Sequence, residues 1–267
     1  MGEPAPVKIS LTPKAGVSYE DGTLHSIDPS VISIISEAIS NNTAITADTT
    51  QLYVDYNDLH YKLSLGTWLD VAGKEYSLYM EIIGFNHDIL SNSVAYGKPN
   101  KFGKAGITFC CKGIFYNEAM NTSASNVGGW QECKIRQTLS NLEENLYPDG
   151  AGKFQYDWRP FIKSVNKKTS AGNSLEDIEI TEDKLFLLSE VEVFGSTTFS
   201  VPGEGTQYAY YKAGNSREKE WQGAASSWWL RSPRSGNNSQ FCRVDTSTVA
   251  DYFGANNTSG VAFAFCI

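Results

Sequence analysis

WWLRSP (residues 228–233) and GVAFAFCI (residues 260–267) are two apolar stretches that bound the most informative part of this 267-residue chain. Adjacent tryptophans suit a buried strand end, because each indole buries roughly 150–250 Å² and its N–H needs a partner. The closing stretch is rich in aromatic and aliphatic residues, which indicates a second core strand. We therefore expect packing to fix both ends of residues 228–267.

The residues between these stretches are polar and rich in Gly, Asn and Ser, which is typical of turns and surface loops. Side chains of a strand alternate between its two faces. If Cys242 and Val244 point inward, then Arg243, Asp245 and Ser247 point outward, and these three are the strongest candidates for ligand contact. The full set expected on this outward surface is Asn237, Asn238, Ser239, Arg243, Asp245, Ser247, Asp251, Tyr252, Phe253, Asn256, Asn257 and Ser259.

A resemblance to a known group of proteins rests on WWLRSP, the following Phe241-Cys242-x-Val244 and GVAFAFCI. These motifs are similar to a family of uncharacterised domains common in gut bacteria and their phages. The resemblance covers roughly residues 70–267 and includes IIGFNHD at 82–88 and EDKLFLLSE at 182–190. Some members look like the variable proteins of diversity-generating retroelements. The resemblance implies a C-type-lectin-like fold, related to that of formylglycine-generating enzymes. It also implies a variable region of about 228–267 that forms a ligand-binding face.

The composition of this region agrees with that resemblance. In such retroelements, adenines of a template repeat are replaced at random, so that asparagine codons yield residues such as Asp, Ser, Thr, Tyr, Phe and Arg. They do not yield Trp, Glu, Lys or Met, and none of these four occurs between Asn237 and Ser259. Gln240 departs from the pattern, because an asparagine codon does not give rise to it.

The upstream residues predict an α+β protein in which a small N-terminal segment precedes the lectin-like part. Residues 1–27 read as a linker or edge strand with several Pro and Gly. Residues 28–69 read as a helix and hairpin segment: Asp28-Pro29 supplies an N-cap and an N1 proline, and the hairpin turns around Asn57-Asp58. The resemblance implies that residues 70–267 then form a C-type-lectin-like ligand-binding domain.

Five further predictions concern the longer part of the chain. The pattern favours one long or two short strands over residues 74–85, a buried strand over 107–111, and one helix over about 131–145 that ends at Pro148-Asp149-Gly150. Ser189 is expected to cap a short helix. The clustered Tyr208, Tyr210 and Tyr211 either lie beside the variable face or pack over the core.

The overall composition excludes several classes of protein. A hydrophobic fraction of 41% is enough for a substantial core, and a net charge of −8 argues against a nucleic-acid partner. No apolar run is long enough for a membrane span, so we expect a soluble protein without membrane insertion. No signal peptide is visible at the start. Five cysteines, an odd number without a CxxC motif, favour free thiols.

Catalytic and metal-binding motifs are missing from the sequence. There is no GxSxG, HExxH or glycine-rich phosphate loop, and only three histidines occur. Asn86-His87-Asp88 favours a turn with side chain to backbone hydrogen bonds over a metal site. We therefore expect no enzyme activity, no catalytic residues, no metal and no cofactor.

The resemblance, together with the missing catalytic motifs, implies a non-enzymatic ligand-binding protein that displays a retroelement-diversified surface on a phage tail or a bacterial cell surface. Its partner would be a protein or glycan receptor, and an oligomer is possible. One alternative is a copper oxidase of the formylglycine-generating type, in which Cys242 and Cys266 bind the metal. A second alternative is a purely structural virion or surface protein.

Overall fold

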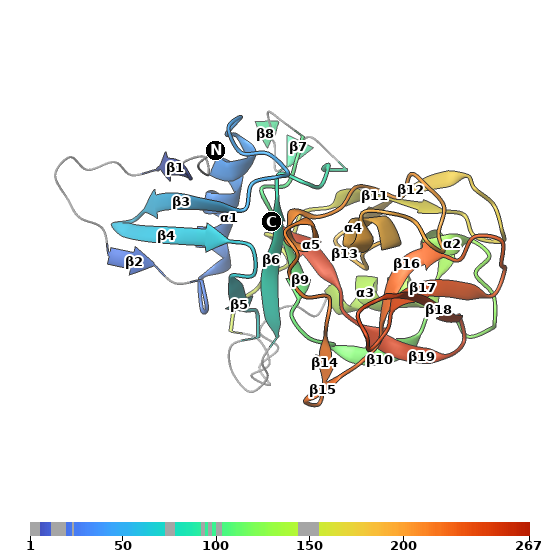
Figure 1. The fold of residues 1–267 in the computed structure, drawn as a ribbon. Coiled ribbons are helices and arrows are strands. Elements are labelled where there is room, and N and C mark those ends of the chain that lie inside the picture. Colours follow the sequence, from blue (N-terminus) through green and yellow to red (C-terminus); the bar gives the residue numbers. More distant parts are fainter. Residues whose placement is uncertain are drawn as a thin grey trace.

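The computed structural model describes residues 6–11, 20–22, 24–72, 78–91, 94–95, 98–99, 103–143 and 155–267. Within them, two five-stranded sheets and a four-stranded N-terminal sheet form most of the regular structure, and the helices are short (Figure 1). The fold is therefore mixed and rich in sheet, which agrees with the expected α+β class. No helix in these residues is long and apolar enough to cross a membrane.

The N-terminal sheet has the strand order β1-β3-β4-β2. Its strands are β1 Val7–Ser10, β2 Glu20–Gly22, β3 Gln51–Tyr56 and β4 Leu59–Ser64. β3 and β4 form the predicted antiparallel hairpin, and its turn residues Asn57 and Asp58 have φ of 49° and 64°. Asn and Asp tolerate this left-handed region better than most residues do. Of the two options for residues 1–27, Val7–Ser10 forms an edge strand.

The predicted first helix is confirmed as α1, Pro29–Ser40. The Asp28 side chain accepts a hydrogen bond of 2.8 Å from the backbone N–H of Ser30, and Asn41 is the C-cap. Ile32, Ile35 and Ile39 are buried, because the spacing of three and four residues places them on one face.

The same helix joins the N-terminal segment to the rest of the chain. Ser36 Oγ donates to the carbonyl oxygen of Ile267, and Asn86 Nδ2 donates to the carbonyl oxygens of Ile39 and Ile45 at 3.0 and 2.9 Å. A Cβ on Gly106 would lie 2.0 Å from the carbonyl oxygen of Ser36, so only glycine permits this approach. The N-terminal segment and the C-terminal strands therefore share one continuous core.

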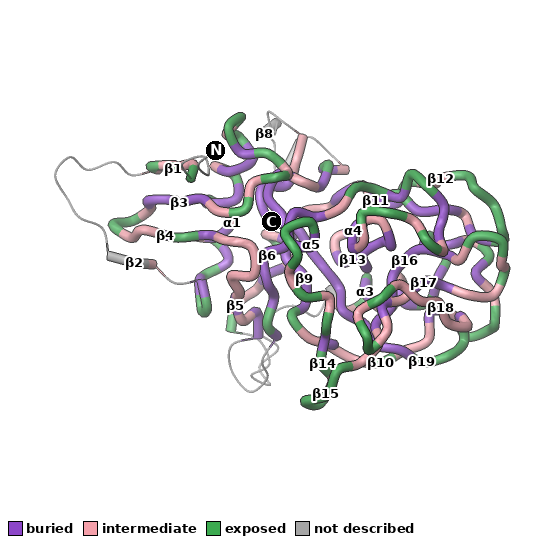
Figure 2. The backbone as a smooth tube through the Cα atoms, in the orientation of Figure 1, coloured by how far each residue is buried: buried purple, intermediate pink, exposed green. Residues whose placement is uncertain are grey.

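The C-terminal stretch GVAFAFCI is divided between the two five-stranded sheets. Gly260 and Val261 end a strand of one sheet, whereas residues 264–266 form a strand inside the other, which we call the first sheet and whose order is β13-β20-β9-β6-β5. Its strands are β5 Trp68–Asp70, β6 Tyr79–Phe85, β9 Ile107–Cys111, β13 Leu185–Phe186 and β20 Ala264–Cys266. All residues of β9 and β20 are buried, as both predictions required. Figure 2 shows that the neighbouring β6 is also largely buried.

The stretch WWLRSP is the central strand of the second five-stranded sheet, whose order is β10-β19-β16-β17-β18. Its strands are β10 Tyr116–Ala119, β16 Trp228–Pro233, β17 Gln240–Val244, β18 Ala250–Gly254 and β19 Thr258–Val261. Every residue of β16 is buried, and each indole N–H finds a carbonyl: Trp228 donates to Arg217 at 3.0 Å and Trp229 to Glu118 at 2.8 Å. The predicted apolar anchors are therefore confirmed.

The single helix predicted over about 131–145 is wrong in one respect. The structure contains α2 Gly129–Glu132 and α3 Lys134–Glu143, separated by an extended, buried Cys133 with φ −69° and ψ 149°. Asn121 Oδ1 accepts a hydrogen bond from the backbone N–H of Lys134, so a distant side chain caps the second helix. The predicted end at 148–150 and the part of the predicted strand over 74–77 lie outside the described residues.

The remaining elements connect and cover the two larger sheets. They are β7 Val94–Ala95, β8 Lys98–Pro99, β11 Val165–Ser170, β12 Ile178–Asp183, α4 Glu190–Phe194, α5 Ala209–Lys212, β14 Glu220–Trp221 and β15 Ala224–Ala225. Ser189 caps α4 in a capping box with Glu192, as predicted. Tyr208, Tyr210 and Tyr211 are buried, so these rings pack over the core and do not extend the variable face.

Candidate ligand-binding face

The β17–β18 hairpin carries the central candidate residues on the edge of its sheet. In its register, Arg243 lies opposite Asp251, and Cys242 lies opposite Tyr252. Cys242 and Val244 are buried and Arg243 and Asp245 are partly exposed, as expected, whereas Phe241 is fully buried although it lies on the same side of β17 as Arg243. The hairpin is therefore anchored by one set of side chains and exposes another.

One side of the hairpin presents a half-buried ion pair beside an aromatic ring. Arg243 Nε and one terminal nitrogen each lie 2.7 Å from Asp251 Oδ2, and the guanidinium lies 4.1 Å from the centre of the Phe253 ring. The side chains of Arg243 and Asp251 are 20% and 31% exposed. Phe253 also packs against Trp229, with ring centres 6.2 Å apart. Arg243, Asp251 and Phe253 thus form one contiguous patch.

Tyr252 lies on the other side of the same strand, and the expectation of a single outward surface is wrong here. Opposed residues of antiparallel strands project to the same side, so Tyr252 shares its side with Cys242 and not with Arg243. Its ring centre lies 3.5 Å from the guanidinium carbon of Arg234 and meets Phe199 edge to face at 4.9 Å. Because β18 is an edge strand, the candidate surface wraps around that edge.

The turn between β17 and β18 is shaped by Asp245. Its Oδ1 accepts hydrogen bonds from the backbone N–H groups of Ser247 and Val249 at 2.8 and 3.0 Å. This carboxylate therefore supports the turn, whereas the exposed Ser247 side chain is presented to solvent. The prediction treated Asp245 as an outward contact only and missed its role in the turn.

The loop before β17 is held in place by Asn126, a fully buried residue that is distant from the loop in sequence. Asn126 Nδ2 donates to the carbonyl oxygens of Asn237 and Gln240, both at 2.8 Å, and its backbone N–H donates to the carbonyl oxygen of Asn238 at 2.9 Å. All three acceptors are backbone atoms. The backbone N–H of Ala255 also donates to the carbonyl oxygen of Ser239 at 2.8 Å. The contacts that hold this loop to the rest of the protein are thus made through its backbone carbonyls.

The other predicted residues differ in their exposure. Asn238, Asn256 and Asn257 are exposed, whereas Asn237 is partly buried and its Oδ1 accepts from the N–H and Oγ of Ser239. Ser259 is buried, and its Oγ donates to the carbonyl oxygen of Ser227 at 3.1 Å. A ligand at the surface cannot reach Ser259, so this residue does not belong to the face.

A buried ionic cluster surrounds Arg231 of β16, the strand that pairs with β17. Arg231 is fully buried, and its terminal nitrogens contact both carboxylate oxygens of Glu192 at 2.5 and 2.9 Å. They also donate to the carbonyl oxygens of Leu187 and Glu204, at 2.8 and 2.9 Å. The buried Lys167 then bridges Glu192 at 2.8 Å and Asp88 at 2.7 Å. We call these residues (Arg231, Glu192, Lys167 and Asp88) the core ion cluster.

Electrostatics keeps the core ion cluster charged. Burial alone would raise the pKa of Glu192, but the charges of Arg231 and Lys167 outweigh it and lower that pKa to about 2. Burial likewise opposes the lowering of the Asp88 pKa, which Lys167 causes. The neighbouring Glu204 behaves in the opposite way: burial raises its pKa to about 7, despite hydrogen bonds from the Ser170 N–H and the Ser232 hydroxyl.

The cysteines required by the oxidase alternative lie in different sheets. Cys242 is on β17 and Cys266 is on β20, where Cys266 Sγ lies 3.4 Å from Thr108 Oγ1 and 3.5 Å from Asp88 Oδ2. Burial raises the pKa of both thiols well above its usual range. In the part of the chain that the structure describes, no group of three or more His, Cys, Asp or Glu residues could hold a metal ion.

Comparison with known proteins gives one match. Residues 104–267, more than half of the chain, match the family described as "Domain of unknown function (DUF6273)". This range includes both apolar stretches, the hairpin and Asn126. Neither curated proteins nor solved structures show a match to the chain.

Proposed function

This chain belongs to the DUF6273 family, and we propose that it is a non-enzymatic ligand-binding protein whose β17–β18 hairpin and flanking loops form an exchangeable recognition face. The face comprises Asn237, Asn238, Ser239, Arg243, Ser247, Asp251, Tyr252, Phe253, Asn256 and Asn257, with Asp245 shaping the turn. Its target is a protein or glycan on a cell surface. We propose further that residues 70–267 have a C-type-lectin-like fold.

The observation that carries the proposal is the way the face is held. Asn126 donates hydrogen bonds to three backbone carbonyl oxygens of residues 237–240. The buried side chains of Phe241, Cys242 and Val244 fix the strand that follows. Exposed side chains such as Asn238 therefore do not determine the shape of the surface. Substitutions at surface positions of this kind typically change the free energy of unfolding by about 0.5 kcal/mol or less. The partner can thus change while the fold persists.

Affinity would come from the aromatic and arginine side chains at the edge strand. Trp, Tyr and Arg are enriched among residues that dominate binding energy. Arg243 of β17 and Phe253 of β18 lie on one side of the hairpin, and Tyr252 of β18 lies on the other side. A ligand that encloses the edge of the sheet at β18 therefore contacts all three residues. Display in several copies on a virion or cell would raise weak binding through avidity.

A pair of display libraries tests the exchangeable face. One library randomises residues 238, 243, 247, 256 and 257, and a matched library randomises five buried positions: 126, 231, 241, 242 and 244. Folding is scored by protease resistance, and folded clones are then selected on immobilised glycans and intact bacterial cells. We expect most clones of the first library to fold and few of the second, and we expect different targets to select different residues at the exchanged positions. Equal loss of folding in both libraries would contradict the proposal.

The genomic surroundings test the retroelement origin separately. A reverse transcriptase gene with a near-identical repeat of the segment that encodes residues 228–267 is expected near the coding sequence. Mismatches between the two copies should fall at adenines of the repeat. Without such a repeat, the face would still be a recognition surface, but a retroelement would not be the source of its variation.

A further inference from the structure

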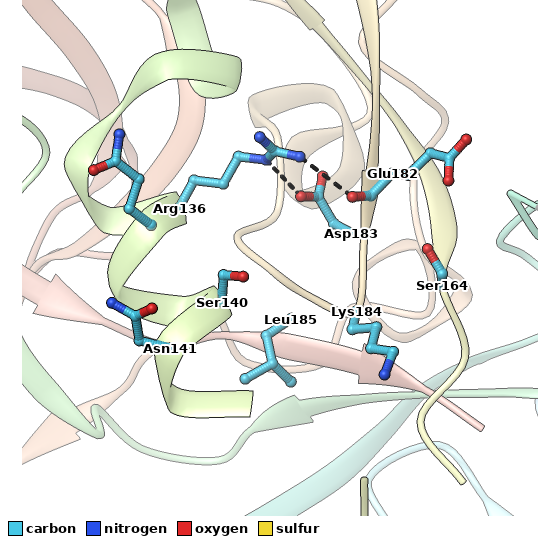
Figure 3. Close-up of a pocket in the computed structure, with 9 residues that line it drawn as sticks. Arg136, Ser140, Asn141, Ser164, Glu182, Asp183, Lys184 and Leu185 are labelled. Carbon is cyan, nitrogen blue, oxygen red and sulfur yellow. Dashed lines mark hydrogen bonds and ion pairs between the residues drawn. The ribbon is translucent and has the colours of Figure 1, made fainter. Parts of the chain in front are cut away.

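A hollow of about 380 Å³ lies outside the recognition face, between α3 and the segment in which β12 leads into β13 (Figure 3). Ser140 and Asn141 line it from the helix, and Ser164 and Lys184 line it from the facing side. None of its lining residues belongs to residues 228–267. Its volume falls at the lower end of the range of small-molecule sites, roughly 300–1,000 Å³.

One wall of this hollow is preorganised by the buried carboxylate of Asp183. This carboxylate accepts hydrogen bonds from Arg136 Nε at 2.7 Å, Trp130 Nε1 at 3.0 Å and Thr181 Oγ1 at 2.5 Å. Arg136 also donates to the carbonyl oxygen of Glu182 at 3.2 Å, so it ties α3 to β12. The charges of Arg136 and Asp183 therefore compensate each other, and the wall is rigid.

The lining excludes strongly charged and strongly apolar ligands. Besides the Arg136–Asp183 pair, it contains one cation and one carboxylate, Lys184 and Glu182, so the formal charges balance. Leu185 is the aliphatic side chain of the lining, and polar and apolar atoms contribute similar shares of the lining surface, whereas most ligand pockets are lined mainly by apolar groups. The hydroxyls and amides of the lining both donate and accept hydrogen bonds. This combination suits a neutral ligand with many hydroxyl groups.

A second hollow, of about 310 Å³, adjoins the first and has the same chemistry. Gln137 lines both hollows. The second one is lined by amide and hydroxyl groups, including those of Asn121, Ser123 and Ser125, and again carries one cation and one carboxylate, Lys134 and Glu132. Two adjoining hollows of like chemistry fit a ligand built from repeated hydroxyl-rich units.

From this arrangement we infer that the surface across α3 binds a neutral oligosaccharide, with Gln137 between two adjacent sugar units. Helix positions 136, 137, 140 and 141 face the first hollow together, because residues three and four apart in a helix are neighbours. This site does not depend on the recognition face, since its residues lie outside the exchanged segment.

The test uses the full chain and a panel of neutral trisaccharides: maltotriose, cellotriose, mannotriose and chitotriose. Trigalacturonate serves as the charged counterpart, and binding is followed by saturation-transfer NMR and titration calorimetry. We expect at least one neutral trisaccharide to bind more tightly than trigalacturonate. Gln137→Ala should weaken that binding about tenfold, because two sugar units lose a shared hydrogen-bonding partner. Ser140→Trp, which fills the first hollow, should weaken it at least as much.

Matched controls separate this site from folding and from the recognition face. Gln131→Ala changes an exposed glutamine of α2 that lines neither hollow, and it should leave binding within about twofold, as expected of a residue outside the contact. In the background of the triple variant Arg243→Ala, Tyr252→Ala and Phe253→Ala, Gln137→Ala should still weaken trisaccharide binding about tenfold, which distinguishes this site from a glycan bound at the recognition face. Absence of binding by every neutral trisaccharide, preference for trigalacturonate, or equal affinities of Gln137→Ala and the parent protein would overturn the inference.

Discussion

Arg231 and Arg243, which lie on adjacent strands, illustrate how burial separates a structural arginine from a recognition arginine. Arg231 is fully buried and forms a two-point contact with Glu192, whereas the side chain of Arg243 is 20% exposed and pairs with a partly exposed Asp251. Removal of one partner from a buried ion pair leaves an uncompensated buried charge and strongly lowers the free energy of unfolding. A surface ion pair contributes little to that free energy. The two arginines should therefore respond differently to the same substitution.

Arg231→Met should lower the free energy of unfolding by about 3–5 kcal/mol, because Glu192 loses its closest cation. Arg243→Met should lower it by about 1 kcal/mol or less. Urea denaturation followed by tryptophan fluorescence measures both values. Similar losses in the two variants would show that Arg243 also belongs to the structural core.

Glu204 predicts a specific dependence of stability on pH. Its pKa is about 7 in the folded protein, against an ordinary value of 4.5. A raised folded pKa stabilises the protein below the unfolded pKa, and this stabilisation is lost as the pH rises through the folded pKa. Between pH 5 and pH 8, Glu204 should therefore remove on the order of 2–3 kcal/mol from the free energy of unfolding.

The variant Glu204→Gln isolates this contribution from other titrating groups. Its free energy of unfolding should fall less between pH 5 and pH 8 than that of the parent protein. Urea midpoints at pH 5, 6, 7 and 8 give the comparison. If both proteins have parallel pH profiles, Glu204 does not become protonated on folding in this range.

Among the elements, the loop before β17 depends most on a residue far away in sequence. Asn126→Ala removes two side-chain donations to the carbonyls of Asn237 and Gln240, as well as the acceptor for the Asn173 N–H. We expect a loss of about 1–3 kcal/mol in the free energy of unfolding, since buried backbone groups lose their partners. Hydrogen exchange of residues 235–241 should become faster. Asn238→Ala, at an exposed neighbour, should change neither quantity.

Elements with strong local signals were predictable from sequence. The Asp28-Pro29 pair defines the start of α1, Asn57-Asp58 defines the first hairpin, and the apolar stretches define β16 and β20. The break at Cys133 was not predictable, because the cap of α3 comes from Asn121, which precedes the helix by 13 residues. Local periodicity contains no information about such a partner.

The candidate site was predictable in part for the same reason. The expected alternation separates buried Cys242 from partly exposed Arg243, but it could not place Tyr252, whose side depends on the register with β17. The hydrogen bonds of Asn126 and the core ion cluster were not predictable either, since their partners are distant in sequence. Ser259 looked like a loop residue, but it lies in β19 and is buried.

At the level of the whole molecule, the N-terminal segment is docked through α1 onto the C-terminal strands. Gly106→Ala would place a methyl group 2.0 Å from the carbonyl oxygen of Ser36, a contact that only movement of the helix relieves. We expect the parent protein to unfold in one calorimetric transition. The variant should unfold at a lower temperature or in two transitions, as separated units do. An unchanged single transition would show that the docking adds little to stability.

The central claim is that the recognition face keeps its shape whatever its exposed side chains are. The most direct measurement is the free energy of unfolding, by urea denaturation, of one variant that carries five exchanges at once: Asn238→Asp, Arg243→Ser, Ser247→Tyr, Asn256→Asp and Asn257→Ser. Because typical surface substitutions cost about 0.5 kcal/mol or less and loss of the Arg243–Asp251 pair costs about 1 kcal/mol or less, the account predicts a total loss below about 3 kcal/mol and unchanged hydrogen exchange in β16, β17 and β20. A larger loss, or faster exchange in those strands, would contradict it.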